Sequence, residues 1–210
     1  MQEMPDKSVD LVLTDPPYGL GFPYPSFEDT QENLKSLLDA AVPEIIRIGK
    51  RVAITPGITN ISLYPKPDWI LNCSWNTTGS RGHCGYNQWM PVLFYGKDLD
   101  GIGKINGVLK SDSLFINGGG FVGFQRGDLE NLHVCPKPVG IIKWLVARLS
   151  NPQDIVLDPF MGSGTTCVAC KKLGRNFIGI EKEPAYVAIA EKRLEKVNNH
   201  KITDFFGVLE

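Results

Sequence analysis

A carboxylate, a rigid turn and an aromatic ring follow one another at the end of an apolar segment near the amino terminus. The segment runs from Val9 to Thr14, and Asp15-Pro16-Pro17-Tyr18 follows it directly. Two consecutive prolines fix φ and lack N–H donors, so the turn cannot continue as a helix, and the Asp15 side chain and the Pro16 carbonyl remain as acceptors. The pattern predicts a site for a ligand that donates hydrogen bonds beside an aromatic ring. An ordinary strand-to-loop turn with an N-capping Asp is the alternative.

A second candidate site is a glycine turn in residues 154–181. The segment Asp154 to Asp158 is typical of a strand, Pro159 to Gly164 of a turn, and a helix, a second strand and Glu181 follow. Glycines in the turn let the backbone approach a ligand, and Glu181 lies 19 positions after Gly162. That spacing is near the offset of about 20 residues at which a carboxylate meets a ribose hydroxyl. Thr165-Thr166 replaces the third glycine of the dinucleotide fingerprint, which favours one adenosine unit over a pyrophosphate.

Together these segments resemble the DNA amino-methyltransferases that use S-adenosylmethionine. Asp15-Pro16-Pro17-Tyr18 is similar to their catalytic motif IV, and the segment from Asp158 to Thr166 to motif I. The segment His133-Val134-Cys135-Pro136-Lys137-Pro138 is similar to motif X. Motif IV precedes motifs X and I, which is the permuted order of the β class. The resemblance covers the chain from about Val9 to Leu194.

The resemblance implies methyl transfer from S-adenosylmethionine to the exocyclic amino group of a flipped-out base in duplex DNA. Adenine N6 is favoured over cytosine N4, because the motif begins with Asp. The implied catalytic residues are Asp15, Pro16, Pro17 and Tyr18, with the ring of Tyr18 stacking on the base. The implied cofactor-binding residues are Lys137, Pro138, Asp158, Pro159, Phe160, Gly162, Ser163, Gly164, Thr165 and Glu181. The compact size would suit a solitary enzyme or one from a restriction-modification system.

Other functions remain open at this point. RNA or the glutamine amides of proteins could be the substrate, although enzymes of those classes with a similar Pro-Pro-Tyr signature often carry motif I first. A nucleic-acid-binding remnant without catalytic activity is a further alternative, and an NAD oxidoreductase is a remote one because the third glycine is absent.

The residues that flank these motifs predict a Rossmann-like α/β fold, with a mostly parallel sheet and helices on both faces. Strands are expected at residues 9–14, 51–55, 68–75, 88–95 and 154–158, and before Glu181. Apolar residues at helical spacing predict helices at 34–46, 139–149 and 186–197. Pro43 should kink or restart the first of these helices.

We expect a single domain over residues 1–210, with a catalytic half at 1–96 and a cofactor-binding half at 133–197. Polar, non-periodic stretches at about 76–87 and 97–132 are expected to form an inserted target-recognition region. Residues 1–49 hold 3 basic and 9 acidic side chains, whereas residues 50–148 hold 11 basic and 6 acidic ones. This positive middle suits contact with DNA phosphates, although the overall net charge is −1.

The chain opens at Met1-Gln2-Glu3-Met4-Pro5, where relatives usually have a further strand and helix. We therefore expect the amino-terminal edge strand of the sheet to be missing, and a homodimer or a partner chain could supply it. The opening residues also lack the pattern of a signal peptide, which predicts a cytoplasmic protein without membrane contact. Five cysteines in unpaired spacings indicate reduced thiols, and we predict no metal site.

Overall fold

The fold is organised around one seven-stranded sheet with the strand order β11-β5-β8-β4-β1-β12-β13. The computed structural model describes residues 1–75, 81–82, 85–86, 88–96, 104–105, 108–109, 112–116 and 137–197. The strands of the sheet are β1 (Val9–Thr14), β4 (Gly49–Ile54), β5 (Trp69–Trp75), β8 (Trp89–Tyr95), β11 (Ser113–Ile116), β12 (Ile155–Asp158) and β13 (Asn176–Gly179).

The sheet is mostly parallel, as the sequence predicts. Only β8 runs against its neighbours, β4 and β5, among the strands described. The other pairs, β11 with β5, β4 with β1, β1 with β12 and β12 with β13, are parallel. Because β4, β1 and β12 run in one direction, the residues that follow them gather at one edge of the sheet, which is where α/β proteins bind ligands.

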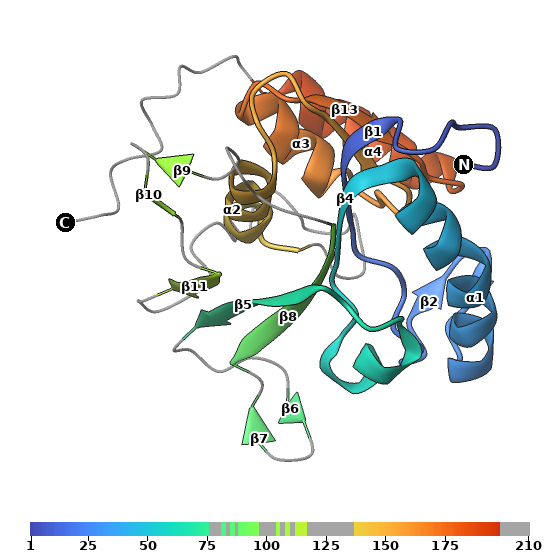
Figure 1. Ribbon diagram of the computed structural model, residues 1–210. Coiled ribbons are helices and arrows are strands. Elements are labelled where there is room, and N and C mark those ends of the chain that lie inside the picture. Colours follow the sequence, from blue (N-terminus) through green and yellow to red (C-terminus); the bar gives the residue numbers. More distant parts are fainter. Residues whose placement is uncertain are drawn as a thin grey trace.

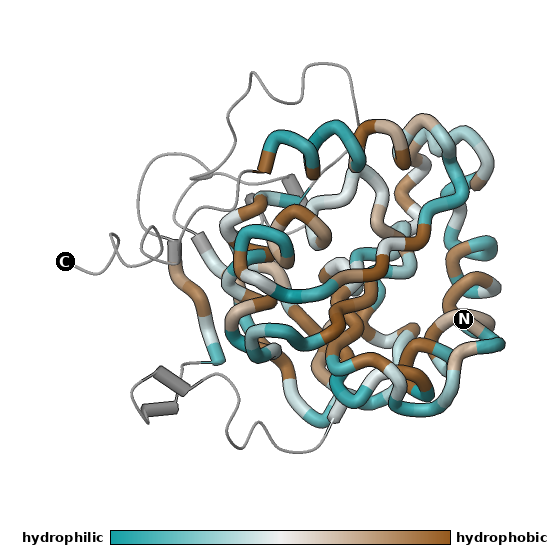
Figure 2. The backbone as a smooth tube through the Cα atoms, turned by 90° about the horizontal axis from the view of Figure 1, so that it is seen from above, coloured by the Kyte–Doolittle hydropathy of each residue, from teal (hydrophilic) through white to brown (hydrophobic). Residues whose placement is uncertain are grey.

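Helices cover both faces of the sheet (Figure 1). Helix α1 (Gln31–Ile48) packs on one face in a cluster with Val12 and Leu157. Helices α2 (Val139–Leu149) and α3 (Thr165–Lys172) pack on the other face in a cluster with Leu11 and Val156. Helix α4 (Pro184–Glu195) lies against α3. Figure 2 shows the hydrophobic segments gathered in the middle of the molecule, as expected for strands that are buried on both sides.

Pro43 does not interrupt α1, so the expectation of a restart there was wrong. The helix begins after Thr30, whose side chain caps the amide of Asn33, and it continues to Ile48. Its buried residues recur at helical spacing on both sides of the proline: Leu34, Leu38, Ala41, Val42, Ile45 and Ile48. This packing against the sheet offsets the single hydrogen bond that a proline removes from a helix.

Strand β11 was also missed, because residues 97–132 were expected to form only loops. Leu114 packs against the core on the α2 face, and β11 pairs in parallel with β5. Most of the predicted recognition loops, at 76–87 and 97–132, lie outside the described residues. Within those stretches the structure also has the short pairs β6 (Arg81–Gly82) with β7 (Gly85–Tyr86), and β9 (Lys104–Ile105) with β10 (Val108–Leu109).

A short hairpin, β2 (Pro23–Tyr24) with β3 (Phe27–Glu28), connects the turn after β1 to α1. A 3-10 helix, η1 (Ile58–Leu63), follows β4. In the parts of the chain that the structure describes, no helix combines the length and the apolar character needed to cross a membrane.

Candidate active site

The turn after β1 places the Asp15 carboxylate at the centre of a hydrogen-bonded cluster. The Tyr18 hydroxyl and the Thr55 hydroxyl each donate to Oδ1 of Asp15 at 2.5 Å. On the other carboxylate oxygen, Lys137 Nζ donates to Oδ2 at 2.7 Å. Thr55 follows β4 and Lys137 precedes α2, so three separate segments supply donors to one carboxylate. Sequence reasoning found Asp15, Tyr18 and Lys137 but missed Thr55.

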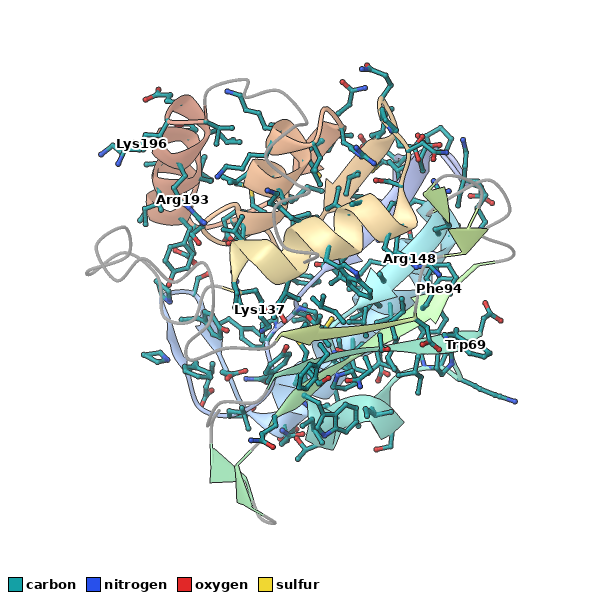
Figure 3. The ribbon with its side chains drawn as sticks, turned by 90° about the vertical axis from the view of Figure 1, so that its left-hand side faces the viewer. Trp69, Phe94, Lys137, Arg148, Arg193 and Lys196 are labelled. Atoms are coloured by element: carbon teal, nitrogen blue, oxygen red, sulfur yellow. The ribbon has the colours of Figure 1, made fainter. Side chains whose placement is uncertain are left out.

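The ring of Tyr18 contacts the backbone of Gly57 and the ammonium of Lys137. Gly57 has φ +72°, and a Cβ added there would lie 3.3 Å from the ring, so the glycine backbone packs against it. The ammonium of Lys137 lies 4.7 Å from the ring centroid, within the range of a cation–π contact. Figure 3 shows Lys137 at the amino-terminal end of α2, above the sheet.

These contacts set the protonation states of the cluster. Burial and the negative charge of Asp15 raise the pKa of Tyr18 well above its usual value, so its hydroxyl remains a donor. Burial lowers the pKa of Lys137, but the neighbouring Asp15 and Tyr18 more than offset this, and the pKa lies above its usual range. Lys137 is therefore an ammonium and Tyr18 a hydroxyl donor, and both contact Asp15.

A buried carboxylate of the following segment shapes the turn itself. Asp29 is only 3% exposed and accepts hydrogen bonds from the amides of Gly19, Leu20 and Phe22 at 2.7, 2.9 and 3.1 Å. The Asn60 side chain of η1 donates to the carbonyl of Tyr18 at 2.8 Å. Among the described residues we find no donor to the carbonyl of Pro16, which leaves that oxygen available as an acceptor.

Asp158 connects the two predicted motifs. Its Oδ1 accepts from the Thr14 hydroxyl at 2.7 Å and from the Phe160 amide at 3.1 Å. The side chain is 4% exposed, and burial raises its pKa to about 6 despite hydrogen bonds from Thr166 and Thr14. Asp158 was predicted to bind the cofactor. Asp158 lines the cavity described below. Its Oδ1 atom, however, connects the end of β12 to the end of β1 through the hydrogen bond from Thr14.

The glycine turn after β12 is held by its backbone and by α4. The Gly162 amide donates to Oε2 of Glu181 at 3.0 Å, and the Glu183 amide donates to Oε1 at 2.9 Å. Gly164 has φ +78°, and an added Cβ would lie 2.7 Å from Cβ of Ala190. Only glycine fits here, because the conformation and the contact with α4 both exclude a side chain.

Arg193 of α4 clamps the same turn, and the sequence analysis did not identify it. Its guanidinium donates to the carbonyl and the hydroxyl of Ser163 at 2.6 and 2.8 Å, and to the Thr165 hydroxyl at 3.2 Å. Figure 3 shows Arg193 on the helix beside this turn. Arg193 lies on the last turn of a helix that the sequence predicts, but helical spacing alone does not reveal a contact with a turn about 30 residues earlier.

A cavity of about 260 Å³ joins the two motifs. Ten of the predicted site residues line it: Asp15, Pro17, Lys137, Asp158, Pro159, Phe160, Gly162, Ser163, Thr165 and Glu181. The other four, Pro16, Tyr18, Pro138 and Gly164, are not among the lining residues. His133 to Pro136 of the predicted motif X lie outside the described residues.

The hairpin β2–β3 supplies a wall of this cavity that the sequence analysis missed. Tyr24, Ser26 and Phe27 line it, and the ring of Tyr24 lies 6.3 Å from the ring of Phe27. Lys182 Nζ donates to the carbonyl of Ser26 at 2.7 Å, which ties the hairpin to the residue after Glu181. The run of aromatic residues at 22–27 was the available signal.

The cysteines that the structure describes, Cys73, Cys167 and Cys170, are buried free thiols. Burial raises the pKa of Cys167 to about 12. No group of three or more His, Cys, Asp and Glu side chains that could hold a metal ion occurs within the described part of the chain.

Comparison with known sequences finds a match in the second half of the chain. Residues 121–192 match a family model described as DNA methylase. The Type II methyltransferase M.HinfI of Haemophilus influenzae is 48% identical over 68 residues, which are 32% of this chain and 19% of that protein. The match thus spans about a fifth of the length of this curated relative.

Solved structures extend the similarity to most of the chain. The M1.HpyAVI–SAM complex matches with a TM-score of 0.64 and 26% identity, over 92% of this chain and 90% of that one. The cytosine-N4-specific PvuII DNA methyltransferase matches with a TM-score of 0.64 and 18% identity, over 97% of this chain and 86% of that one. At that identity the second match shows the shared fold alone. Residues 121–192 are thus similar in sequence to a DNA methylase family, and nearly the whole chain is similar in fold to the M1.HpyAVI and PvuII structures.

Proposed function

We propose that this protein transfers a methyl group from S-adenosylmethionine to the exocyclic amino group of a base in DNA, with adenine N6 as the target. The observation that carries the proposal is the shared cavity. Asp15 of the turn after β1 and Gly162 of the turn after β12 line the same space, so a group that accepts amino hydrogens borders the candidate cofactor site.

The lining of the cavity fits S-adenosylmethionine, a zwitterionic nucleoside. Glu181 is a partly buried carboxylate with both oxygens in the turn region, and each oxygen retains acceptor capacity for a ribose hydroxyl beyond its one backbone hydrogen bond. Phe160, Met161 and Tyr186 offer apolar surface for the adenosine and for the carbon chain beside the sulfonium. Lys137 supplies a positive charge for the amino-acid end. When bound, the cofactor supplies a methyl group on a sulfonium sulfur, which is a good leaving group.

Asp15 and the Pro16 carbonyl would act on the target nitrogen. The lone pair of an exocyclic amino group is delocalised into the base, so the nitrogen is a weak nucleophile. Two acceptors on its N–H groups favour a tetrahedral nitrogen and localise the lone pair. Methylation leaves a positive charge on that nitrogen, and Asp15 can then accept the proton that it loses. Positioning and electrostatics supply the catalysis, and no covalent intermediate with the protein is required.

A base within a duplex cannot reach this turn, so we propose that the target nucleotide flips out. Asp as the first residue of the motif favours adenine, whereas cytosine N4 is the runner-up. The positive charge of residues 50–148 suits contact with phosphates, and part of that segment would read the target sequence. We also propose that a second subunit or a partner chain covers the edge at β13, where Ile178 is 41% exposed. Sedimentation of the purified chain, alone and with DNA, tests that assembly.

The function is tested by incubating the protein with labelled S-adenosylmethionine and, in separate reactions, duplex DNA, RNA and protein extract. Nucleoside analysis of the labelled product is expected to give N6-methyladenine from DNA. Label in N4-methylcytosine would keep the enzyme class and change the target base. Label in RNA or protein alone would contradict the proposal, and binding of DNA without any transfer would favour a non-catalytic function.

A further inference from the structure

Lys137 occupies the place that the target amino group needs. Its ammonium donates to Oδ2 of Asp15 at 2.7 Å and lies 4.7 Å from the centroid of the Tyr18 ring. Under the proposed function, an amino group of the base would donate to the same carboxylate and the base would lie against the same ring. The two occupants compete, because the Thr55 and Tyr18 hydroxyls already donate to the other oxygen of Asp15.

The ion pair is partly protected from solvent, so opening it is unfavourable unless each charge gains a new partner. The side chains of Lys137 and Asp15 are 17% and 28% exposed. Removing one member of a buried pair leaves the other charge uncompensated, which is strongly unfavourable. Any ligand that moves Lys137 from Asp15 must therefore offer the ammonium a new anion.

The cavity beside Lys137 is where such an anion would bind. Two of the described residues lining the cavity are cations, Lys137 and Lys182. Lys182 is engaged by the carbonyl of Ser26, at the Glu181 end. Lys137 is thus placed to receive the carboxylate of an amino-acid group at the Asp15 end. A sulfonium near Asp15 would also repel an ammonium that remained there.

We propose that Lys137 is a displaceable counter-ion that blocks the target site until the cofactor binds. In the free protein its ammonium pairs with Asp15. When an aminoacyl nucleoside fills the cavity, the ammonium pairs with the ligand carboxylate, and Asp15 becomes free to accept the amino group of the base. This inference rests on the proposed function, and it assigns Lys137 as a positioning residue that couples cofactor binding to exposure of Asp15.

A double-mutant cycle in cofactor affinity tests the exchange without DNA. Calorimetry measures the binding of S-adenosylhomocysteine, which keeps the carboxylate, and of 5′-methylthioadenosine, which lacks it. The proteins are the wild type, Asp15→Asn, Lys137→Met and the double variant, with Lys35→Met on the exposed face of α1 as the matched control. Circular dichroism melts verify that each variant is folded.

Asp15→Asn is expected to tighten S-adenosylhomocysteine roughly three- to tenfold, because it releases Lys137 for the ligand carboxylate. Lys137→Met should weaken the binding of S-adenosylhomocysteine by about tenfold. Adding Asp15→Asn to Lys137→Met should not restore this affinity. All four proteins should bind 5′-methylthioadenosine within about twofold of one another, and Lys35→Met should behave as the wild type.

The proposed exchange would be overturned by any of three results: Asp15→Asn leaves the affinity for S-adenosylhomocysteine unchanged, changes the affinity for both ligands equally, or has the same effect in the Lys137→Met background. A folded wild type that binds neither ligand would overturn the proposed cofactor as well. A wild type that binds S-adenosylhomocysteine but shows no coupling between the two positions would overturn the exchange alone and leave the proposed function standing.

Discussion

The turn after β1 and the glycine turn after β12 border the same cavity but are held in different ways. The first depends on charged and hydroxyl side chains from three distant segments, with Lys137 and Thr55 converging on Asp15. The second also receives hydrogen bonds from Arg193, but its conformation depends mainly on backbone geometry, with Gly164 packed against Ala190 and the Gly162 amide bound to Glu181. The first turn should therefore be sensitive to changes of charge, and the second to changes of shape.

The largest expected effect is on the chemistry of the first turn. Asp15→Ala should lower the rate of methyl transfer at least about 100-fold, since it removes the acceptor for the target amino group. Binding of S-adenosylhomocysteine should not weaken, because Asp15 acts on the base and the loss of its carboxylate releases Lys137 for the ligand. Initial rates with labelled cofactor and calorimetry measure the two quantities. Asp15→Asn should retain more activity than Asp15→Ala, since its amide oxygen still accepts.

Asp39→Ala on the exposed face of α1 is the matched control, and it should transfer methyl groups at the wild-type rate. Turnover of Asp15→Ala close to the wild-type rate would show that the catalytic assignment is incorrect.

The next effect concerns Asp158, which joins the two turns. Burial raises the pKa of Asp158 from the ordinary value of an aspartate to about 6, so the folded state binds this proton more tightly than the unfolded state does. The wild type should therefore lose roughly 2–3 kcal/mol of stability relative to Asp158→Asn as the pH rises from about 4 to 7. Denaturant melts of both proteins across this range measure the difference. A difference that stays constant with pH would mean that Asp158 ionises normally.

The shape of the second turn is tested by a pair of glycine substitutions. Gly164→Ala meets both a positive φ and a contact at 2.7 Å with Ala190, whereas Gly174→Ala meets a positive φ of +67° and open space. The left-handed conformation costs about 1 kcal/mol at each site, and the clash should add about 1–3 kcal/mol at Gly164. Urea denaturation compares the two variants, and Ala190→Gly should partly rescue Gly164→Ala. Equal losses at the two glycines would contradict the close packing of α4 on this turn.

The smallest expected effect concerns cofactor affinity at Glu181. Glu181→Ala removes the carboxylate that we assign to the ribose hydroxyls and that binds the Gly162 amide, so S-adenosylhomocysteine should bind at least about tenfold more weakly. Glu191→Ala, on the exposed side of α4, is the matched control. An unchanged dissociation constant for Glu181→Ala would place the ribose elsewhere in the cavity.

Local sequence patterns were sufficient to predict most of the sheet and its helices. The alternation of apolar strands and amphipathic helices predicted the parallel sheet, and α2 was predicted with the bounds that the structure has. The turns after β1 and β12 were also predicted from the sequence, because Pro16-Pro17 and Gly162 determine the backbone geometry over a few residues. The functional roles of the residues in these turns remain predictions.

Other features depended on contacts between residues far apart in the chain. The local chemistry of Pro43 predicted a kink or a restart in α1. The helix does not restart there, because its burial on the sheet offsets the lost hydrogen bond. Strand β11 was missed because four residues between irregular segments carry too weak a local pattern, and its pairing with β5 stabilises it. The hairpin wall at Tyr24 and Phe27 was missed for the same reason.

The sequence by itself determined most strands of the main sheet, the two turns and the order of the motifs, because these depend on backbone conformation and on the spacing of apolar residues. Only the tertiary structure decided which charged side chains of the site form ion pairs. Lys137 and Asp15 are 122 residues apart and form an ion pair because β1 and the start of α2 meet at one edge of the sheet. Electrostatic interactions act through space, so neither residue type nor spacing along the chain predicts which charges will face each other in the folded protein.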